Sequence, residues 1–302
     1  MLISDKTSDI YLLIFLESGC NRFTQRPPII SFLDPYLFRG FVILISMGAY
    51  NTETYEISPH FKYSIADNPS LDSLKQLANI DIKSETSEFS KAEYIIGFSH
   101  QLFTHNGDNE PSAADPLTIL REAKEGQSFR CVEYSTLAMG LLWAYKIPAR
   151  TIGLKTCDVE IRKYGAGHVV IEFWCKDYNK WVMCDVQAGI IPKHNEIPIS
   201  AYELSNYLKF HETITFAPIE HSRFKQNSRY GDKKSYEEWI KDYLCFIDTP
   251  LDLTFDIKDR RKQQIVMLVP LDKKYPKSFQ GLFDMNALYT HSVKDFYPEL
   301  HI

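Results

Sequence analysis

The chain has 302 residues and a formal net charge of −5, which is enough chain for one large domain or two modest ones. Hydrophobic residues make up 44% and charged residues 24%, an ordinary globular composition that excludes collagen-like, coiled-coil and disordered chains. Because 34 Lys and Arg stand against 39 Asp and Glu, the sequence lacks the basic balance of nucleic-acid-binding proteins. We therefore expect no nucleic-acid partner.

The N-terminal region gives no clear targeting signal. The uncharged and largely apolar run at residues 40–50 is too short to cross a bilayer, and we predict no transmembrane helix. The apolar run at residues 10–16 lacks the net positive start of a signal peptide. The cytoplasm is the favoured location. A secreted or cell-envelope location stays open because Arg39 and the run that follows could be a signal, and a start of translation at Met47 is a further alternative.

The composition along the chain predicts three parts. Residues 1–58 have no sustained periodicity and are expected to form an N-terminal extension of uncertain structure. Residues 59–205 contain regular helix and strand patterns and are expected to form the core. Residues 206–302 are expected to form an α/β extension that packs on this core.

Four helices are expected in the first half, each with a start signal. The first three begin at Asn68-Pro69, at a capping box Ser90-x-x-Glu93 ending near Asn106-Gly107, and at Asp115-Pro116 with a stop at Gly126. The fourth runs from Cys131 to Tyr145 and is apolar almost all round, which is typical of a central buried helix.

Strand patterns follow these helices. They cover residues 150–157, 168–175 and 181–186, and the last two are joined by a turn at 177–180. Further on, Ser235-x-x-Glu238 predicts a helix with an apolar face from Trp239 to Ile247, and residues 253–257 and 265–269 predict two more strands. Helices first and an antiparallel sheet afterwards indicate an α+β fold.

The hairpin at 168–186 has a regular alternation. One face carries only apolar side chains, at Val169, Ile171, Phe173, Cys175, Val182, Cys184 and Val186. Because alternate residues of a strand share a face, His168 and Asp185 lie together on the opposite face. A carboxylate there can hydrogen-bond the imidazole and fix its tautomer.

Cys131 begins the buried helix, where unpaired backbone N–H groups and the helix dipole favour an anion. A thiolate is such an anion, and a helix N-terminus together with a nearby imidazolium converts a thiol into a nucleophile. The sequence therefore predicts a Cys131, His168 and Asp185 triad.

The motifs around these three residues resemble those of bacterial members of the transglutaminase-like superfamily. They are residues 126–135 (GQSFRCVEYS), 147–150 (IPAR), 167–174 (GHVVIEFW) and 181–185 (WVMCD), preceded by 103–107 (FTHNG). The resemblance covers roughly residues 60–200. Lys146 departs from it, because the family usually carries glycine before Ile-Pro-Ala-Arg. The Gly-Gln-Cys-Trp motif and a calcium loop of animal transglutaminases are absent from the sequence.

This resemblance implies a papain/transglutaminase-like core, with N-terminal helices and a central buried helix packed on an antiparallel sheet. It implies a thiol enzyme that attacks peptide or protein amides through a thioester, with Cys131 as nucleophile, His168 as acid and base, and Asp185 orienting it. No cofactor and no metal are expected. Hydrolysis is favoured over crosslinking.

Two other interpretations stay open, namely a peptide-binding module with an idle triad and an amidase acting on glycan-linked asparagine. Gln127 is a candidate oxyanion donor, and Tyr164 and Trp174 are candidates to line a substrate groove. The oligomeric state is left open.

The other cysteines are given a structural interpretation. The six cysteines include no C-x-x-C pair, so the sequence indicates neither a zinc site nor a disulfide framework. We expect Cys157, Cys175, Cys184 and Cys245 to be small buried hydrophobic residues. Cys175 and Cys184 share a face but sit diagonally, so we expect both to be reduced.

Overall fold

The computed structural model describes residues 48–298, except 63–67, 83–84, 220–232 and 254–262. The chain divides into a unit of residues 1–40, which lies outside the described residues, and a unit of residues 41–302, which contains everything below. Of the predicted N-terminal extension, residues 48–58 are described. No helix in the described part of the chain is long and apolar enough to cross a membrane.

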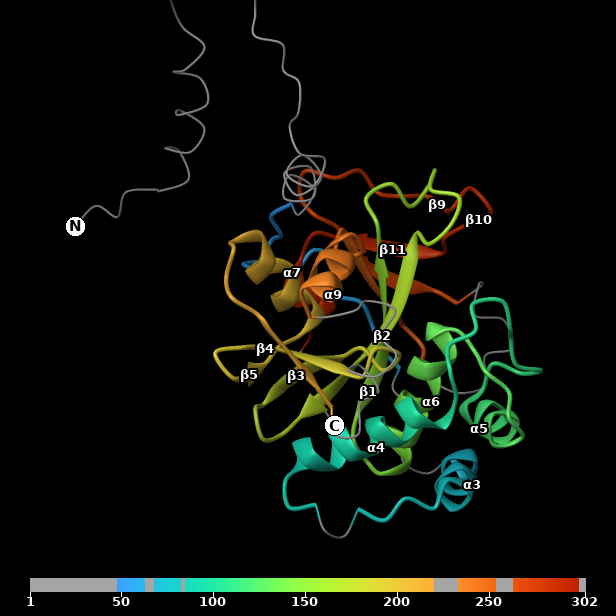
Figure 1. The fold of residues 1–302 in the computed structure, drawn as a ribbon. Coiled ribbons are helices and arrows are strands. Elements are labelled where there is room, and N and C mark those ends of the chain that lie inside the picture. Colours follow the sequence, from blue (N-terminus) through green and yellow to red (C-terminus); the bar gives the residue numbers. More distant parts are fainter. Residues whose placement is uncertain (1–47, 63–67, 83–84, 220–232, 254–262, 299–302) are drawn as a thin grey trace, which may run out of the picture. The chain divides into compact units, whose positions relative to one another are not determined.

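A six-stranded sheet is the centre of the described fold, in the order β11-β8-β7-β1-β2-β3 (Figure 1). Its strands are β1 (Ala149–Lys155), β2 (Gly167–Cys175), β3 (Lys180–Cys184), β7 (Phe246–Pro250), β8 (Ile265–Leu268) and β11 (Ala287–Thr290). All neighbours are antiparallel except β11 and β8. The strands of residues 206–302 thus complete the same sheet as those of residues 59–205.

The hairpin of β2 and β3 confirms the predicted register. Ile171 pairs with Cys184 and Phe173 with Val182, and these four side chains lie in one buried apolar cluster. Cys175 and Cys184 are free and buried as predicted. The opposite face is buried as well, since Val170 and Met183 belong to a second cluster.

Helices cover both faces of the sheet. The apolar cluster on one face contains residues from α3 (Pro69–Ala78), α4 (Glu88–Leu102), α5 (Pro116–Lys124) and α6 (Cys131–Ala144). The cluster on the other face contains residues from α7 (Ala201–Lys209), α9 (Lys233–Lys241) and α10 (Val293–Phe296). Smaller sheets are formed by β4 (Ile190–His194), β5 (Ile197–Pro198) and β6 (Thr215–Pro218), and by β9 (Ser278–Phe279) and β10 (Phe283–Asp284).

The helix starts follow the capping signals in part. Asn68 caps α3 by accepting the Ser70 N–H at 2.9 Å, and Asp115 caps α5 by accepting the Thr118 N–H at 2.9 Å, as predicted. The start predicted at Ser90 is wrong, because Ser87 caps α4 and Ser90 completes its capping box. That helix also ends earlier than predicted, at Leu102.

Two predictions for the second half are wrong. Ser235 lies inside α9 instead of capping it, and this helix ends at Lys241, so that Ile247 belongs to β7. The strand pattern at 265–269 is confirmed by β8. Most of the strand predicted at 253–257 lies outside the described residues.

A disulfide joins Cys157 to Cys245, with their Cα atoms 5.1 Å apart. The expectation that these two cysteines are isolated hydrophobic residues is therefore wrong. They are separated by 88 positions in the sequence, and only the pairing of β1 with β7 brings them together. The bond ties the loop after β1 to the segment that connects α9 with β7.

Arg150 anchors the C-terminal segment to the sheet. Its fully buried guanidinium donates to Glu172 Oε2 at 3.1 and 2.8 Å and to the Phe296 carbonyl at 2.9 Å. A buried carboxylate such as Glu172 is tolerated only when it is paired and hydrogen-bonded. Glu172 also accepts the Ala201 N–H at 2.8 Å and the Tyr297 hydroxyl at 2.7 Å, so this one ion pair joins β1, β2, α7 and the end of the described chain.

Candidate active site

Cys131 is the first residue of α6. The helix starts there because the Arg130 N–H donates to Glu133 Oε2 at 3.2 Å, which closes the first turn. Backbone N–H groups in a first turn have no acceptor within the helix, so they attract an anion. The Ser135 hydroxyl, one turn further, donates to the Val169 carbonyl at 2.9 Å and holds this end of α6 against β2.

His168 and Asp185 meet on the face of β2 and β3 that the register predicts. His168 Nε2 lies 2.7 Å from Asp185 Oδ2, and the other carboxylate oxygen accepts the Ala188 N–H at 2.9 Å. His168 also shares a hydrogen bond with Cys131. Because Asp185 occupies Nε2, Nδ1 is the ring nitrogen left to face the thiol.

The opposite charges of His168 and Asp185 stabilise each other. Burial alone would lower the pKa of His168, but the charge and hydrogen bond of Asp185, aided by Cys131, outweigh burial and raise it to about 10. Burial would raise the pKa of Asp185, but the charge of His168 and the hydrogen bonds from His168, Ala188 and Tyr236 hold it below its usual range. At neutral pH the pair is therefore an imidazolium and a carboxylate.

Aromatic side chains of α9 and of the turn after it cover the pair. The Tyr236 hydroxyl donates to Asp185 Oδ2 at 2.9 Å. The Trp239 ring stands edge-on to His168 with ring centres 4.8 Å apart, and the Tyr243 ring lies 6.1 Å away. His168 and Asp185 are consequently buried, whereas Cys131 keeps partial exposure.

The three other candidates have different surroundings. Gln127 is exposed, and its side-chain oxygen is 3.5 Å from Asn109 Nδ2. Tyr164 is 87% exposed. Trp174 packs edge-on against Trp181, and it lies six residues along β2 from His168, or ~20 Å in an extended strand. The structure thus brings together Cys131, His168 and Asp185, but it does not bring Trp174 to them.

No group of three or more His, Cys, Asp or Glu in the described ranges is arranged to hold a metal ion. The site places a thiol at a helix N-terminus beside an imidazolium and a carboxylate. This is the arrangement of an activated nucleophile with an oriented acid and base.

Comparison with protein families finds one match in this region: the sequence of residues 75–186 fits the transglutaminase-like superfamily. This segment of the chain belongs to the transglutaminase-like superfamily. The segment contains Cys131, His168 and Asp185, together with α6 and the hairpin of β2 and β3.

Two solved structures show likeness to the chain. A candidate cysteine protease from Cytophaga hutchinsonii is 18% identical over 39% of this chain and 37% of its own, with a TM-score of 0.32. A TGase is 13% identical over 61% of this chain and 38% of its own, with a TM-score of 0.25. The chain thus aligns with well under half the length of either protein. No curated protein sequence matches it.

The aromatic cover lies outside the transglutaminase-like segment, and sequence reasoning missed it. The sequence predicts Trp239 and Tyr243 on an apolar helix face without a role in the site, and it does not distinguish Tyr236. Tyr236 and Trp239 lie three residues apart on one face of α9, and Tyr243 lies in the turn that follows the helix. That spacing was the available signal, but the sequence does not indicate which surface the helix covers.

Lys146 stands in the turn after α6, where the family usually carries glycine. Lys146 follows the end of α6 and adopts a left-handed conformation with φ of 65°. Glycine adopts such a φ without steric cost, which explains its use at this turn. The turn still delivers the chain into β1, and the triad of the transglutaminase-like segment is assembled with lysine in this position.

Proposed function

We propose that the chain is a cysteine-dependent amide hydrolase or acyltransferase that acts on peptide or protein amides through a thioester. The observation that carries the proposal is the continuous chain of interactions from Asp185 through His168 to Cys131, with 2.7 Å between carboxylate and imidazole. Cys131 is partly exposed, while His168 is buried, which keeps water from its charge.

In the first half-reaction, Sγ of Cys131 attacks the carbonyl carbon of the amide. The oxygen of the tetrahedral intermediate carries a negative charge, which the N–H groups at the start of α6 stabilise. His168 then gives its proton to the departing nitrogen, the carbon–nitrogen bond breaks, and the acyl group remains on Cys131 as a thioester.

In the second half-reaction, water or an amine attacks the thioester while neutral His168 accepts its proton. The carbon–sulfur bond breaks, which releases an acid or a new amide and restores the thiolate and the imidazolium. Asp185 remains ionised throughout and holds His168 in the orientation that serves both steps. The same residues thus support hydrolysis and transfer, and the attacking group decides between them.

The reaction can be tested with p-nitrophenyl acetate, an activated ester that needs no specific recognition. We expect a burst of p-nitrophenol and an acetyl group on Cys131 in the quenched protein. Addition of methylamine should divert the product from acetate to the amide if the site transfers acyl groups. Cys131→Ser and His168→Ala should abolish the burst, and Cys175→Ser, which changes another free cysteine, should keep it.

A burst that is unchanged in Cys131→Ser would contradict the proposal, because the acyl group would then reside on another residue. Loss of the burst in Cys175→Ser would contradict it too, provided that the variant retains the wild-type circular dichroism. A folded wild-type protein without any burst would favour the alternative of an idle triad.

A further inference from the structure

The disulfide between Cys157 and Cys245 joins two chain segments that border the candidate active site. Cys245 lies two positions after Tyr243, the last ring of the aromatic cover. Cys157 lies two positions after the end of β1, whose last residue pairs with Gly167, the residue before His168. The bond therefore connects the segment that carries the cover to the strand that lies beside the imidazole.

The connection from the disulfide to the cover is short. The Tyr243 N–H donates to the Ile240 carbonyl at 3.0 Å, so the turn after α9 continues the helix towards Cys245. The Cys245 N–H donates to the Lys155 carbonyl at 3.2 Å, which holds the end of this turn on β1. Tyr243 and Cys245 are separated by a single residue, so their Cα atoms are no more than ~7.6 Å apart. A movement of Cys245 therefore also moves Tyr243.

The aromatic cover consists of the rings of Tyr236, Trp239 and Tyr243. The centre of the Trp239 ring lies 4.9 Å from that of Tyr243 and 5.8 Å from that of Tyr236. Trp239 is half-buried, whereas His168, 4.8 Å from it between ring centres, is buried. Exclusion of water strengthens the attraction between the charges of His168 and Asp185. The position of the Trp239 ring consequently affects the pair that activates the thiol.

The two cysteines of the bond differ in exposure. Cys157 is exposed and Cys245 is buried, so a reductant meets the bond at Cys157. A thiolate of a dithiol attacks Cys157 Sγ, forms a mixed disulfide and releases the Cys245 sulfur. The second thiol of the reagent then attacks its own sulfur in the mixed disulfide and releases Cys157. Two electrons and two protons pass to the protein, which leaves an oxidised dithiol and two cysteine thiols.

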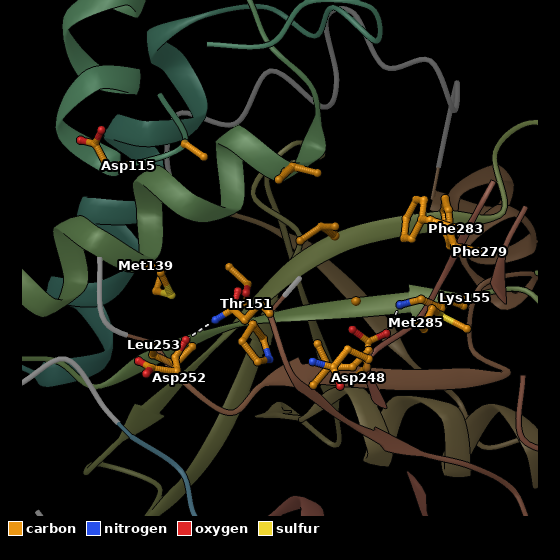
Figure 2. Close-up of a pocket in the computed structure, with 18 residues that line it drawn as sticks. Asp115, Met139, Thr151, Lys155, Asp248, Asp252, Leu253, Phe279, Phe283 and Met285 are labelled. Atoms are coloured by element: carbon orange, nitrogen blue, oxygen red, sulfur yellow. Dashed lines mark hydrogen bonds and ion pairs between the residues drawn. The ribbon is translucent and has the colours of Figure 1, made fainter. Parts of the chain in front are cut away.

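The strands beside the bond have further contacts that do not depend on it. Gly153 of β1 pairs with Asp248 of β7. The Asp248 carboxylate is paired with Lys155 Nζ, and both side chains are almost fully buried. Figure 2 shows this ion pair as a dashed line in the wall of a cavity of about 300 Å³. We therefore expect reduction to release the turn after α9 while β1 and β7 stay together.

We propose that the bond between Cys157 and Cys245 is a redox-sensitive lock. While the bond is oxidised it holds the aromatic cover against His168, and a dithiol that reduces it loosens the cover and lowers the reactivity of Cys131. Trp239 acts as a positioning residue in this device. The regulation rests on the proposed function, since it concerns the same site. It makes the site most reactive in an oxidising compartment, where disulfides persist.

The first test compares alkylation of Cys131 by iodoacetamide at pH 6 in oxidised full-length protein and in protein that has been reduced with dithiothreitol and desalted. Mass spectrometry measures the labelling of each cysteine separately. We expect reduction to slow the labelling of Cys131 about two- to thirtyfold, the range of coupling through packed elements, and reoxidation to restore it. Cys175→Ser, which changes a free cysteine, should respond to reduction like the wild type.

A variant of the cover asks whether the disulfide acts through Trp239. Trp239→Leu should slow the labelling of Cys131 with the disulfide intact, and reduction should slow it little further, because effects that share one route are not additive. Trp174→Leu is the matched control, because Trp174 packs against Trp181 on another part of β2. This control should keep both the wild-type rate and the wild-type response to reduction.

The ¹³Cε1 NMR signal of the His168 ring gives a readout that a general loss of stability would not move. The ring current of Trp239 contributes to this signal because the two rings are in contact. We expect the signal to shift in Trp239→Leu, and reduction of the wild type should shift it in the same direction. Trp174→Leu should leave it in place.

Three results would overturn the proposal. The first is a reduced, folded protein in which Cys131 is labelled at the oxidised rate. The second is a Trp239→Leu variant that labels like the wild type or responds to reduction as strongly as the wild type. The third is loss of the circular dichroism on reduction, because the bond would then support the whole fold and not the cover.

The same experiments separate this proposal from the proposed function. If reduction shifts the His168 signal while the oxidised protein shows no burst with p-nitrophenyl acetate, the proposed function fails and the link between the disulfide and the cover remains. If the burst occurs equally in the oxidised and the reduced protein and the His168 signal does not move, the lock fails alone.

Discussion

Tyr236 donates its hydroxyl proton to Asp185 Oδ2 at 2.9 Å, and the same oxygen lies 2.7 Å from His168 Nε2. The two donors come from different parts of the chain, one from α9 and one from β2. Because both bind one carboxylate oxygen, α9 fixes the direction in which Asp185 points and thereby the ring of His168. We regard Tyr236 as a positioning residue.

Tyr236→Phe should weaken the site without removing any triad member. A hydrogen bond to a charged acceptor contributes about 1.5–3 kcal/mol, so the free energy of unfolding should fall by up to that amount. The pKa of Asp185 should rise, because one of the groups that lower it is gone. The fall in the rate of Cys131 alkylation at acidic pH, which we call its acid limb, should therefore begin at a higher pH. Tyr207→Phe, on α7, is the control. An acid limb that stays in place in Tyr236→Phe would show that the hydroxyl only fills space.

Asp185→Asn should lower the pKa of His168 from about 10 to its ordinary value of 6.5 or below. The carboxylate is the main group that raises this pKa, and the burial that opposes it remains. Titration of the His168 ring by NMR measures the change. Turnover of p-nitrophenyl acetate should fall about 10²- to 10⁴-fold, the usual contribution of an acid–base group. A His168 pKa that stays near 10 would mean that Asp185 does not control it.

The free energy of unfolding should depend on pH because the pKa values of His168 and Asp185 both change when the protein folds. The folded pKa of His168 is raised, so its contribution is complete below pH 6.5 and is lost as the pH rises towards 10. The folded pKa of Asp185 is lowered, so its contribution is present above its ordinary value of 3.8 and is lost in acid. We expect urea unfolding to give a maximum between these limits and a loss of a few kcal/mol towards pH 10. His168→Gln should flatten the alkaline decline, and an equal decline in this variant would contradict the assignment.

Removal of the disulfide should destabilise the fold. A crosslink that closes a loop of 88 positions contributes about 4–5 kcal/mol in the chain-entropy account. The Cys157→Ser, Cys245→Ser double variant should therefore unfold at lower urea concentration, and Cys175→Ser serves as a cysteine control outside the bond. Disulfides persist in oxidising compartments, so thiol counting on protein isolated under non-reducing conditions should find Cys157 and Cys245 blocked. Free thiols at both positions would contradict the bond.

Short sequence patterns predict the triad and much of the fold. The alternation along 168–186 defined one apolar face and set His168 and Asp185 on the other, and the register of Ile171 with Cys184 agrees with it. Asn68-Pro69 and Asp115-Pro116 marked helix starts, because each cap depends on atoms only two or three residues apart.

Contacts between residues that are far apart in the sequence cannot be predicted from such short patterns. The bond between Cys157 and Cys245 requires β1 and β7 to be neighbours, and no local spacing encodes that pairing. Tyr236 reaches Asp185 across 51 positions for the same reason.

The central claim is that Cys131 and His168 form a reactive thiolate–imidazolium pair. Its most direct test is the rate at which iodoacetamide alkylates each cysteine between pH 5 and 9, followed by mass spectrometry in the wild type, His168→Ala and His194→Ala. We predict rapid labelling of Cys131 alone at pH 6, lost in His168→Ala and retained in His194→Ala, which changes a histidine on β4. Labelling of Cys131 at pH 6 that is as slow as that of Cys175, or equally fast without His168, would contradict the account.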